Sequence, residues 1–170
     1  MKVLVTAFEP FNNSLVNYSK ETLKYIKNAD TLVLDVIYDQ CYQVLSSNDL
    51  SSYDLIIATG EARSRSELTL EAQAFNIASC RLPDNNGVVK KNEKIKDGNE
   101  VLKTTVDISK CTDIVTLSFD PGRFVCNNLY YYLLSDYPNK AIFIHIPNCE
   151  HESEYLKYAK QIEKIIEILS

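Results

Sequence analysis

The sequence has no run of basic residues and no long apolar segment. Its 170 residues carry 18 Lys and Arg against 23 Asp and Glu, which gives a formal net charge of -5 at pH 7. The chain therefore lacks the electrostatic footprint of a nucleic-acid binder, and we expect no nucleic-acid partner. No segment approaches the roughly 20 consecutive apolar residues of a membrane-spanning helix, so we expect no membrane association.

A secretory signal is also missing from the pattern of the first residues. Residues 1–11 begin with one lysine and an apolar run, but Glu9 and Pro10 end that run before it reaches the length of a signal-peptide core. We therefore expect a cytoplasmic protein.

The cysteines show no CxxC pair. They are odd in number and widely spaced, which argues against a disulfide framework and favours reduced thiols. Most free cysteines are small buried hydrophobic residues, so a reactive one has to be recognised by its surroundings. The five are Cys41, Cys80, Cys111, Cys126 and Cys149.

No internal repeat or low-complexity linker divides the chain, so residues 1–170 are expected to form one domain. Short β-branched and apolar runs predict strands, and helical spacing between them predicts helices. The predicted strands are residues 2–8, 31–38, 54–59, 112–119 and 141–146, and the predicted helices include 19–27, 39–46 and 125–134.

This alternation of strands and helices predicts an α/β fold. The runs at 114–117 and 142–144 are almost continuously apolar, which suits a parallel sheet buried on both faces. We expect a three-layer α/β/α sandwich with a mostly parallel twisted central sheet. An apolar stripe along the last segment predicts a helix that lies on this sheet; it consists of Tyr155, Ala159, Ile162, Ile166 and Leu169. Residues 81–110 are polar and rich in turn formers, and they predict an exposed loop or hairpin.

One cysteine stands where catalytic groups often lie. Residues 120–123 form a predicted tight turn after the strand 112–119, and the predicted helix 125–134 then begins next to Cys126. A helix N-terminus can stabilise a thiolate and lower the pKa of the thiol. Cys126 is thus a candidate nucleophile, although a packed thiol at a helix start is the plain structural alternative.

A candidate base accompanies it. His145 comes at the carboxyl end of the strand 141–146, the sheet edge at which ligands bind in open α/β folds. A cysteine and a histidine on neighbouring strand ends suit a thiol hydrolase, whereas a lone histidine would more often be a satisfied core residue. His151 is expected at the surface. Cys149 and the two histidines match none of the common zinc patterns, so neither a metal nor another cofactor is expected.

Ordered sequence blocks across nearly the whole chain resemble those of one known family. The block VTAFEPFNN, followed by Asn17 and Ser19, is similar to the family's TGFEPFGG and NPS. TGEARSR resembles GQAGGR, LEAQAFN resembles the segment with ERVAIN, and RLPDNNG resembles ARxPDNxG. The segment SFDPGRFVCN matches the nucleophile block, and FIHIP matches the histidine block FIHVP. With these blocks in this order, the chain resembles the pyroglutamyl peptidase I (pyrrolidone-carboxylate peptidase) family.

The resemblance implies a cysteine peptidase that removes N-terminal pyroglutamate from peptides. It implies Cys126 as nucleophile, His145 as base and Glu71 as the carboxylate that orients the imidazole. Arg65 would stabilise the oxyanion together with the backbone N–H of Cys126. The residues implied to line the lactam pocket are Phe8, Phe11, Asn17, Phe124 and Val125. A homo-oligomer is compatible with the resemblance, because the family assembles as tetramers, although this chain is shorter than typical members.

The chain departs from the family pattern at several positions. Glu61 replaces a glutamine, Tyr18 a proline, and Arg63 and Ser64 two glycines. Ala72 replaces an arginine, and Ala7, Asn12 and Asn13 replace glycines. Asparagine tolerates left-handed backbone, so we expect Asn12 and Asn13 to keep the turn. Two alternatives stay open beside the active peptidase: a non-catalytic or altered-specificity homologue that binds a pyroglutamyl or related lactam, and a cysteine amidohydrolase acting on a small amide.

Overall fold

The central strands are buried on both faces, as their apolar sequences predict. In the computed structural model, which describes residues 1–170, every residue of β1 (Val3–Phe8) and β8 (Ala141–Pro147) is buried. Val3, Val5 and Ala7 enter one hydrophobic core, whereas Leu4 and Phe8 enter a second core on the other face of the sheet. Alternate side chains of one strand therefore stabilise both sides of the molecule.

The main sheet has six strands in the order β2-β1-β3-β8-β4-β7. Its remaining strands are β2 (Asp30–Leu34), β3 (Leu55–Ala62), β4 (Thr69–Glu71) and β7 (Thr116–Ser118). The first four strands in this order are parallel to one another. β4 pairs antiparallel with β8 and parallel with β7, so β4 and β7 run against the other four.

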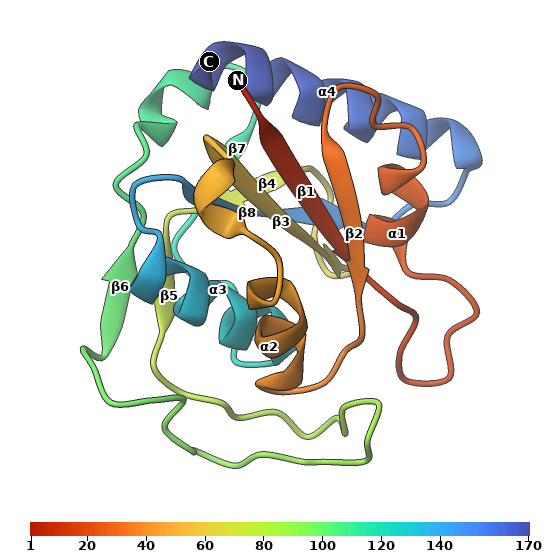
Figure 1. Ribbon diagram of the computed structural model, residues 1–170. Helices are drawn as coiled ribbons and strands as arrows, with labels where there is room; N and C mark the ends of the chain where they lie inside the picture. The colour runs from red at the N-terminus through yellow and green to blue at the C-terminus, as the bar shows by residue number, and fades with distance from the viewer.

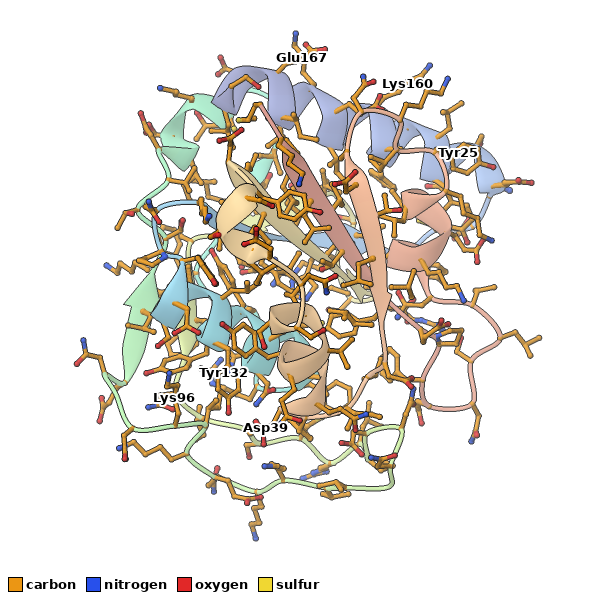
Figure 2. All side chains as sticks on the ribbon, in the orientation of Figure 1. Tyr25, Asp39, Lys96, Tyr132, Lys160 and Glu167 are labelled. Carbon is orange, nitrogen blue, oxygen red and sulfur yellow. The ribbon has the colours of Figure 1, made fainter.

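Helices cover both faces of the sheet (Figure 1), which confirms the predicted three-layer fold with a mostly parallel sheet. Residues of α1 (Tyr18–Leu23) and α4 (Glu152–Leu169) pack into the first core, and residues of α2 (Gln40–Ser46) and α3 (Val125–Asp136) pack into the second. The predicted stripe of α4 faces the sheet, while Lys160 and Glu167 project outward from this helix (Figure 2). None of the helices is both long enough and apolar enough to cross a membrane.

Two predicted strands are too long. The strand predicted at 31–38 ends at Leu34, and the one predicted at 112–119 is β7 alone, preceded by a short 3-10 helix, Ile108–Cys111. Val36 and Tyr38 nevertheless pack into the second core from a loop. Their apolar character thus reflects burial without strand pairing, which a sequence pattern does not distinguish from a strand.

The polar segment 81–110 is mostly loop, as predicted. One short strand within it, β6 (Val101–Lys103), pairs antiparallel with β5 (Gln73–Phe75) in a separate two-stranded sheet. A second 3-10 helix, Leu50–Ser52, precedes β3. Asn12 and Asn13 both have positive φ, which confirms that asparagine supports left-handed backbone in the turn after β1.

Candidate active site

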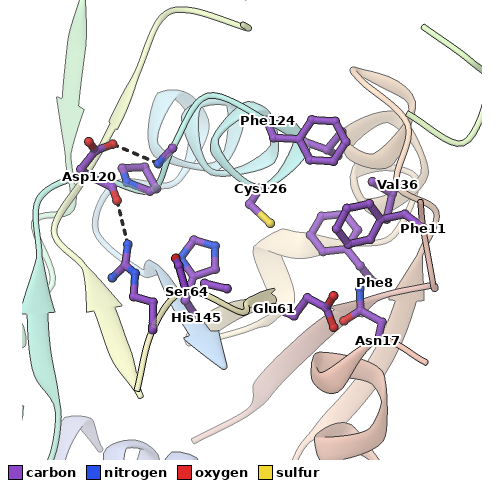
Figure 3. Close-up of a pocket in the computed structure, with 15 residues that line it drawn as sticks. Phe8, Phe11, Asn17, Val36, Glu61, Ser64, Asp120, Phe124, Cys126 and His145 are labelled. Carbon is purple, nitrogen blue, oxygen red and sulfur yellow. Dashed lines mark hydrogen bonds between the residues drawn. The ribbon is translucent and has the colours of Figure 1, made fainter. Parts of the chain in front are cut away.

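A cavity of about 310 Å³ opens where β1, β3 and β8 end and α3 begins. Figure 3 shows the thiol of Cys126, the ring of His145 and a group of phenylalanine rings around this one pocket. Eight of the residues predicted for the site line it: Phe8, Phe11, Asn17, Arg65, Phe124, Val125, Cys126 and His145. The ninth, Glu71, lies behind His145 and is fully buried.

Cys126 is the second residue of α3 and reaches the pocket by a route that strand order alone does not suggest. β7 runs opposite to β8, so the carboxyl ends of these two strands lie at opposite edges of the sheet. The prediction that Cys126 and His145 lie near each other is correct, but the assumption of parallel strand ends is wrong for β7. The segment between β7 and α3 instead runs back toward His145, through Asp120, Pro121 and Gly122, which line the pocket.

A glycine makes room for the thiol. A Cβ atom at Gly60 would lie 2.6 Å from Sγ of Cys126 and 3.1 Å from the ring of Phe143. Contacts of 2.6 Å do not occur between packed carbon and sulfur atoms, so a larger residue at position 60 would displace the thiol or the strand.

The surroundings of Cys126 favour the neutral thiol. Burial, together with the charges of Glu61 and Glu71, raises the pKa of Cys126 to about 12, and the backbone N–H of Cys126 opposes this shift only in part. The helix N-terminus predicts a lowered pKa for this thiol, but desolvation outweighs the helix effect here. A nucleophilic role therefore needs a base that removes the proton during attack.

His145 and Glu71 form a buried pair on the face of the sheet that α3 covers. The pairing of β8 with β4 sets His145 opposite Thr69, and the carboxylate of Glu71 reaches the imidazole from the same short strand. Nδ1 of His145 lies 2.7 Å from Oε1 of Glu71. The side chains are 5% and 0% exposed, so water does not compete for this contact.

The carboxylate of Glu71 is held in its ionised form. Burial by itself raises the pKa of Glu71, but the hydrogen bond and charge of His145, with Ser118 and Arg65, hold that pKa below its usual value. An ionised carboxylate accepts hydrogen bonds only, so Nδ1 of His145 carries the proton and Nε2 is the free acceptor.

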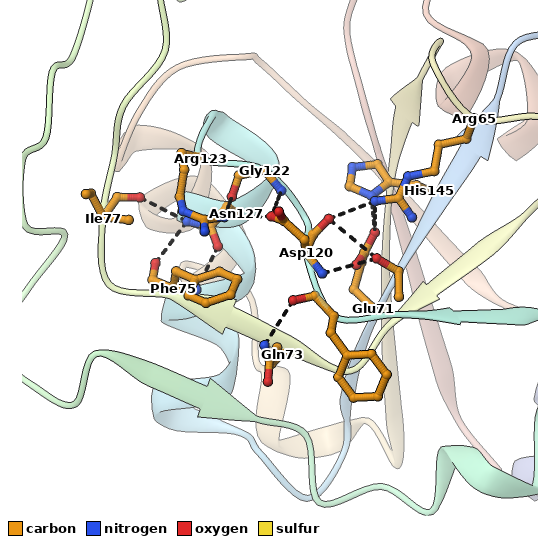
Figure 4. Close-up of polar contacts among 12 residues, drawn as sticks. Arg65, Glu71, Gln73, Phe75, Ile77, Asp120, Gly122, Arg123, Asn127 and His145 are labelled. Atoms are coloured by element: carbon orange, nitrogen blue, oxygen red, sulfur yellow. Dashed lines mark hydrogen bonds and ion pairs between the residues drawn. The ribbon is translucent and has the colours of Figure 1, made fainter.

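Arg65 contacts the carboxylate of Glu71 (Figure 4). Its Nη2 lies 2.8 Å from Oε1 of Glu71 and donates to the carbonyl of Asp120 at 2.8 Å. Nη1 donates to Oγ1 of Thr69 at 2.7 Å. These contacts suit a residue that fixes Glu71 and the segment leading to α3, and none of them is with Cys126.

Aromatic rings form the wall opposite the histidine. The rings of Phe11 and Phe124 have centroids 5.6 Å apart, and Tyr38 packs edge-on against Phe124 at the same distance. Phe8 and Val125 are almost completely buried beneath them. The wall therefore suits a flat apolar ring.

Asn17 joins the wall to α1. Its Oδ1 caps the helix by accepting from N–H and Oγ of Ser19, at 3.0 and 2.7 Å, and its Nδ2 donates to the carbonyl of Glu9 at 3.1 Å. The hydroxyl of Ser19 in turn accepts from the N–H of Phe8 at 3.1 Å. Asn17 thus positions part of the aromatic wall and keeps one N–H of its amide beyond these contacts.

Several lining residues were not predicted from the sequence. Glu61 lines the cavity and is marked by the sequence only as a departure from the family pattern. Gly60 packs beside Cys126 without lining the cavity, and it belongs to a matched block in which the sequence assigns it no role. The other unpredicted lining residues are Val36, Ala62, Ser64, Asp120, Pro121 and Gly122. No three histidine, cysteine or acidic side chains come together as metal ligands. His151 is exposed at the start of α4, as expected.

Comparisons with known proteins point to one family. The sequence model described as "Pyroglutamyl peptidase" matches residues 1–153. The pyrrolidone-carboxylate peptidase of Thermosipho africanus is 33% identical over 167 residues, which cover 86% of this chain and 82% of the relative. The corresponding protein of Staphylococcus haemolyticus is 32% identical over 171 residues, with 86% and 79% covered.

Solved structures agree with this sequence similarity. A mutant pyrrolidone carboxyl peptidase from Pyrococcus furiosus superposes with a TM-score of 0.88 at 27% identity, covering 99% of this chain and 98% of the other. Pyroglutamyl peptidase I from Bacillus amyloliquefaciens superposes with a TM-score of 0.82 at 27% identity, covering 99% and 92%.

Proposed function

The chain belongs to the pyroglutamyl peptidase family of cysteine exopeptidases, and from this premise we propose that it hydrolyses the bond after an N-terminal pyroglutamyl residue through Cys126, His145 and Glu71. One observation carries the proposal. A thiol and an imidazole share a pocket, and the far nitrogen of that imidazole is bound to a buried carboxylate at 2.7 Å. This arrangement supports the roles of nucleophile, base and orienting group that a triad requires.

The first half of the reaction forms a thioester. Nε2 of His145 takes the proton of the Cys126 thiol while Sγ attacks the carbonyl carbon of the pyroglutamyl residue. The oxygen of the tetrahedral intermediate becomes negatively charged, and the backbone N–H of Cys126, in the first turn of α3, is suited to donate to it. Collapse of the intermediate breaks the C–N bond, and His145 returns the proton to the leaving amine.

The second half regenerates the enzyme. A water molecule gives a proton to His145 and attacks the thioester carbon, the C–S bond breaks, and the proton goes to Sγ as pyroglutamate leaves. Glu71 stabilises the imidazolium that forms in each half, and Arg65 holds the carboxylate in place. Arg65 is thus proposed as a positioning residue whose effect passes through Glu71, because its guanidinium contacts are on that side.

The ring pocket accounts for the choice of substrate. The rings of Phe8, Phe11 and Phe124 enclose a neutral five-membered lactam without having to desolvate an ammonium group. The amide of Asn17 offers a polar contact for the edge of the lactam. Peptides with an N-terminal pyroglutamate are therefore the proposed substrates.

A substrate panel tests the proposal. One fluorogenic leaving group is linked in turn to pyroglutamate, proline, alanine and glutamine, and kcat/KM is measured for each. We expect efficient hydrolysis of the pyroglutamyl compound, with the mismatched ring of proline slower by up to about 10⁴-fold. Comparable rates on prolyl and pyroglutamyl compounds would refute the ring pocket, and no hydrolysis of any compound would favour a non-catalytic lactam-binding homologue.

A further inference from the structure

A buried carboxylate stands in the wall of the ring pocket. The side chain of Glu61, at the end of β3, is only 3% exposed and lines the same cavity as Cys126 and Phe8 (Figure 3). The proposed mechanism assigns it no step. A negative charge beside a site for a neutral lactam needs a partner, because an unpaired buried carboxylate is costly.

Arg63 and Tyr18 supply the partners of that carboxylate. Nε of Arg63 lies 2.9 Å from Oε1 of Glu61, and the backbone N–H of Tyr18 donates to Oε2 at 2.8 Å. Arg63 is the only cationic side chain within ion-pair distance of Glu61. Neutralisation of the negative charge of Glu61 therefore depends on its one contact with Arg63.

The position of Arg63 is itself fixed. Nη2 of Arg63 donates to Oγ of Ser14 at 2.7 Å, and the guanidinium lies 5.0 Å from the ring centroid of Tyr18. The side chain of Arg63 is 49% exposed, whereas that of Glu61 is enclosed. The arginine is thus the exposed member of the ion pair, and Glu61 is the member that lines the ring pocket.

Glu61, Arg63 and Tyr18 are three of the positions at which the chain departs from the family pattern, which has glutamine, glycine and proline there. Proline has no N–H, so the bond from residue 18 to Glu61 requires a residue other than proline. The introduced carboxylate therefore occurs together with both of its partners in one connected cluster.

We propose that Arg63 determines the charge preference of the ring pocket by neutralising Glu61. This inference rests on the proposed function. With Arg63 in place the pocket has no free negative charge and favours the uncharged lactam. Without Arg63 the carboxylate of Glu61 attracts a ring whose nitrogen is charged, as in an N-terminal proline, which carries a secondary ammonium. Arg63 is thus a specificity-determining residue that acts through Glu61.

Arg63→Met removes the charge while keeping most of the apolar stem. Two readouts are compared with the wild type: kcat/KM for prolyl and pyroglutamyl compounds with one leaving group, and the dissociation constants of prolinamide and pyroglutamamide by calorimetry. We expect the prolyl-to-pyroglutamyl ratio to rise by about tenfold or more in both readouts, as one unscreened charge pair in a partly buried site predicts.

Matched variants isolate the charge of Glu61. Glu61→Gln combined with Arg63→Met should return the ratio to within about threefold of the wild type, and Arg63→Lys should keep it there, because neither leaves a lone carboxylate. Lys160→Met removes the same charge from the exposed face of α4 and should leave the ratio unchanged. Should Arg63→Met fail to fold, Arg63→Gln tests the same loss of charge with a side-chain donor retained.

An unchanged ratio in folded Arg63→Met would overturn the inference, as would a raised ratio that persists in the double variant. Calorimetry does not require turnover, so the ratio of dissociation constants tests the role of Arg63 even if the wild type hydrolyses no pyroglutamyl compound. That last result would overturn the proposed function alone.

Discussion

The chemistry of the site depends on where a single proton lies. The pKa of Cys126 is raised to about 12, so the thiol carries its proton at neutral pH in the free protein. In the proposed mechanism this proton moves to His145 as Sγ attacks, and the step requires Nδ1 of the ring to be held by an ionised Glu71. We therefore expect the pair formed by His145 and Glu71 to control the pH range of activity.

Arg65→Met should move that range. Removing the guanidinium takes away one of the interactions that hold the pKa of Glu71 low, so the pKa of Glu71 should rise. Because the ionised carboxylate exists only above its pKa, activity should disappear at a higher pH on acidification. The measurement is the acid limb of kcat/KM against pH, which we expect to shift upward relative to the wild type.

The same variant distinguishes the two roles considered for Arg65. If Arg65 instead donated a hydrogen bond to the oxyanion, Arg65→Met would lower kcat by about 10²–10³-fold at every pH and would leave the acid limb in place. A pH-independent loss of that size would contradict a role that passes through Glu71.

Gly60→Ala is expected to impair activity more than stability. The added Cβ would lie 2.6 Å from Sγ of Cys126, so the thiol must move away from its position beside the pocket. A displacement of about 1 Å in a reacting group can cost 10²-fold in rate. The measurement is kcat/KM together with the melting temperature, and a rate within threefold of the wild type would show that the thiol has room to spare.

At the scale of elements, α1 links the stability of a helix to the shape of the pocket. Asn17→Ala removes the acceptor that caps α1 and should lower the free energy of unfolding by about 1 kcal/mol. Asn17→Ser keeps a capping oxygen but has no amide N–H. We expect the serine variant to unfold close to the wild type and still to lose preference for pyroglutamyl over prolyl compounds.

Thermal unfolding and kcat/KM on the two compounds, measured on both variants, separate the two effects. If Asn17→Ser keeps the full preference for pyroglutamate, then Asn17 acts only as a helix cap and the proposed contact between its amide and the edge of the lactam is not made.

Local sequence predicts some of these elements and not others. The long apolar strands and the helix that begins at Val125, one residue before Cys126, are predictable, because apolar character and its spacing are properties of the local sequence. β4 was not, because it has only three residues, and Glu71 was identified through family resemblance alone. The reversed direction of β7 and the contacts of Arg65 depend on tertiary packing that no local pattern encodes.

At the scale of the whole molecule, the sheet unites the two cores. β1 contributes Val3 and Val5 to one core and Leu4 and Phe8 to the other. One core cannot come apart without exposing the strands that support the second. We therefore infer that residues 1–170 form a single folding unit.

This inference predicts one cooperative transition. Denaturant unfolding followed by far-ultraviolet circular dichroism and by tyrosine fluorescence should give coincident curves with a single midpoint. The eleven tyrosines report on both faces, since Tyr130 lies in one core and Tyr158 in the other. Two separated transitions would indicate that the faces unfold independently.

The most direct test of the central claim is a comparison of Cys126→Ala with the wild type on a pyroglutamyl-linked fluorogenic substrate. The triad predicts that the wild type hydrolyses it and that the variant, folded and still able to bind pyroglutamamide, loses turnover by on the order of 10⁶-fold. A Cys126→Ala protein that keeps turnover within tenfold of the wild type would contradict the assignment of Cys126 as the nucleophile.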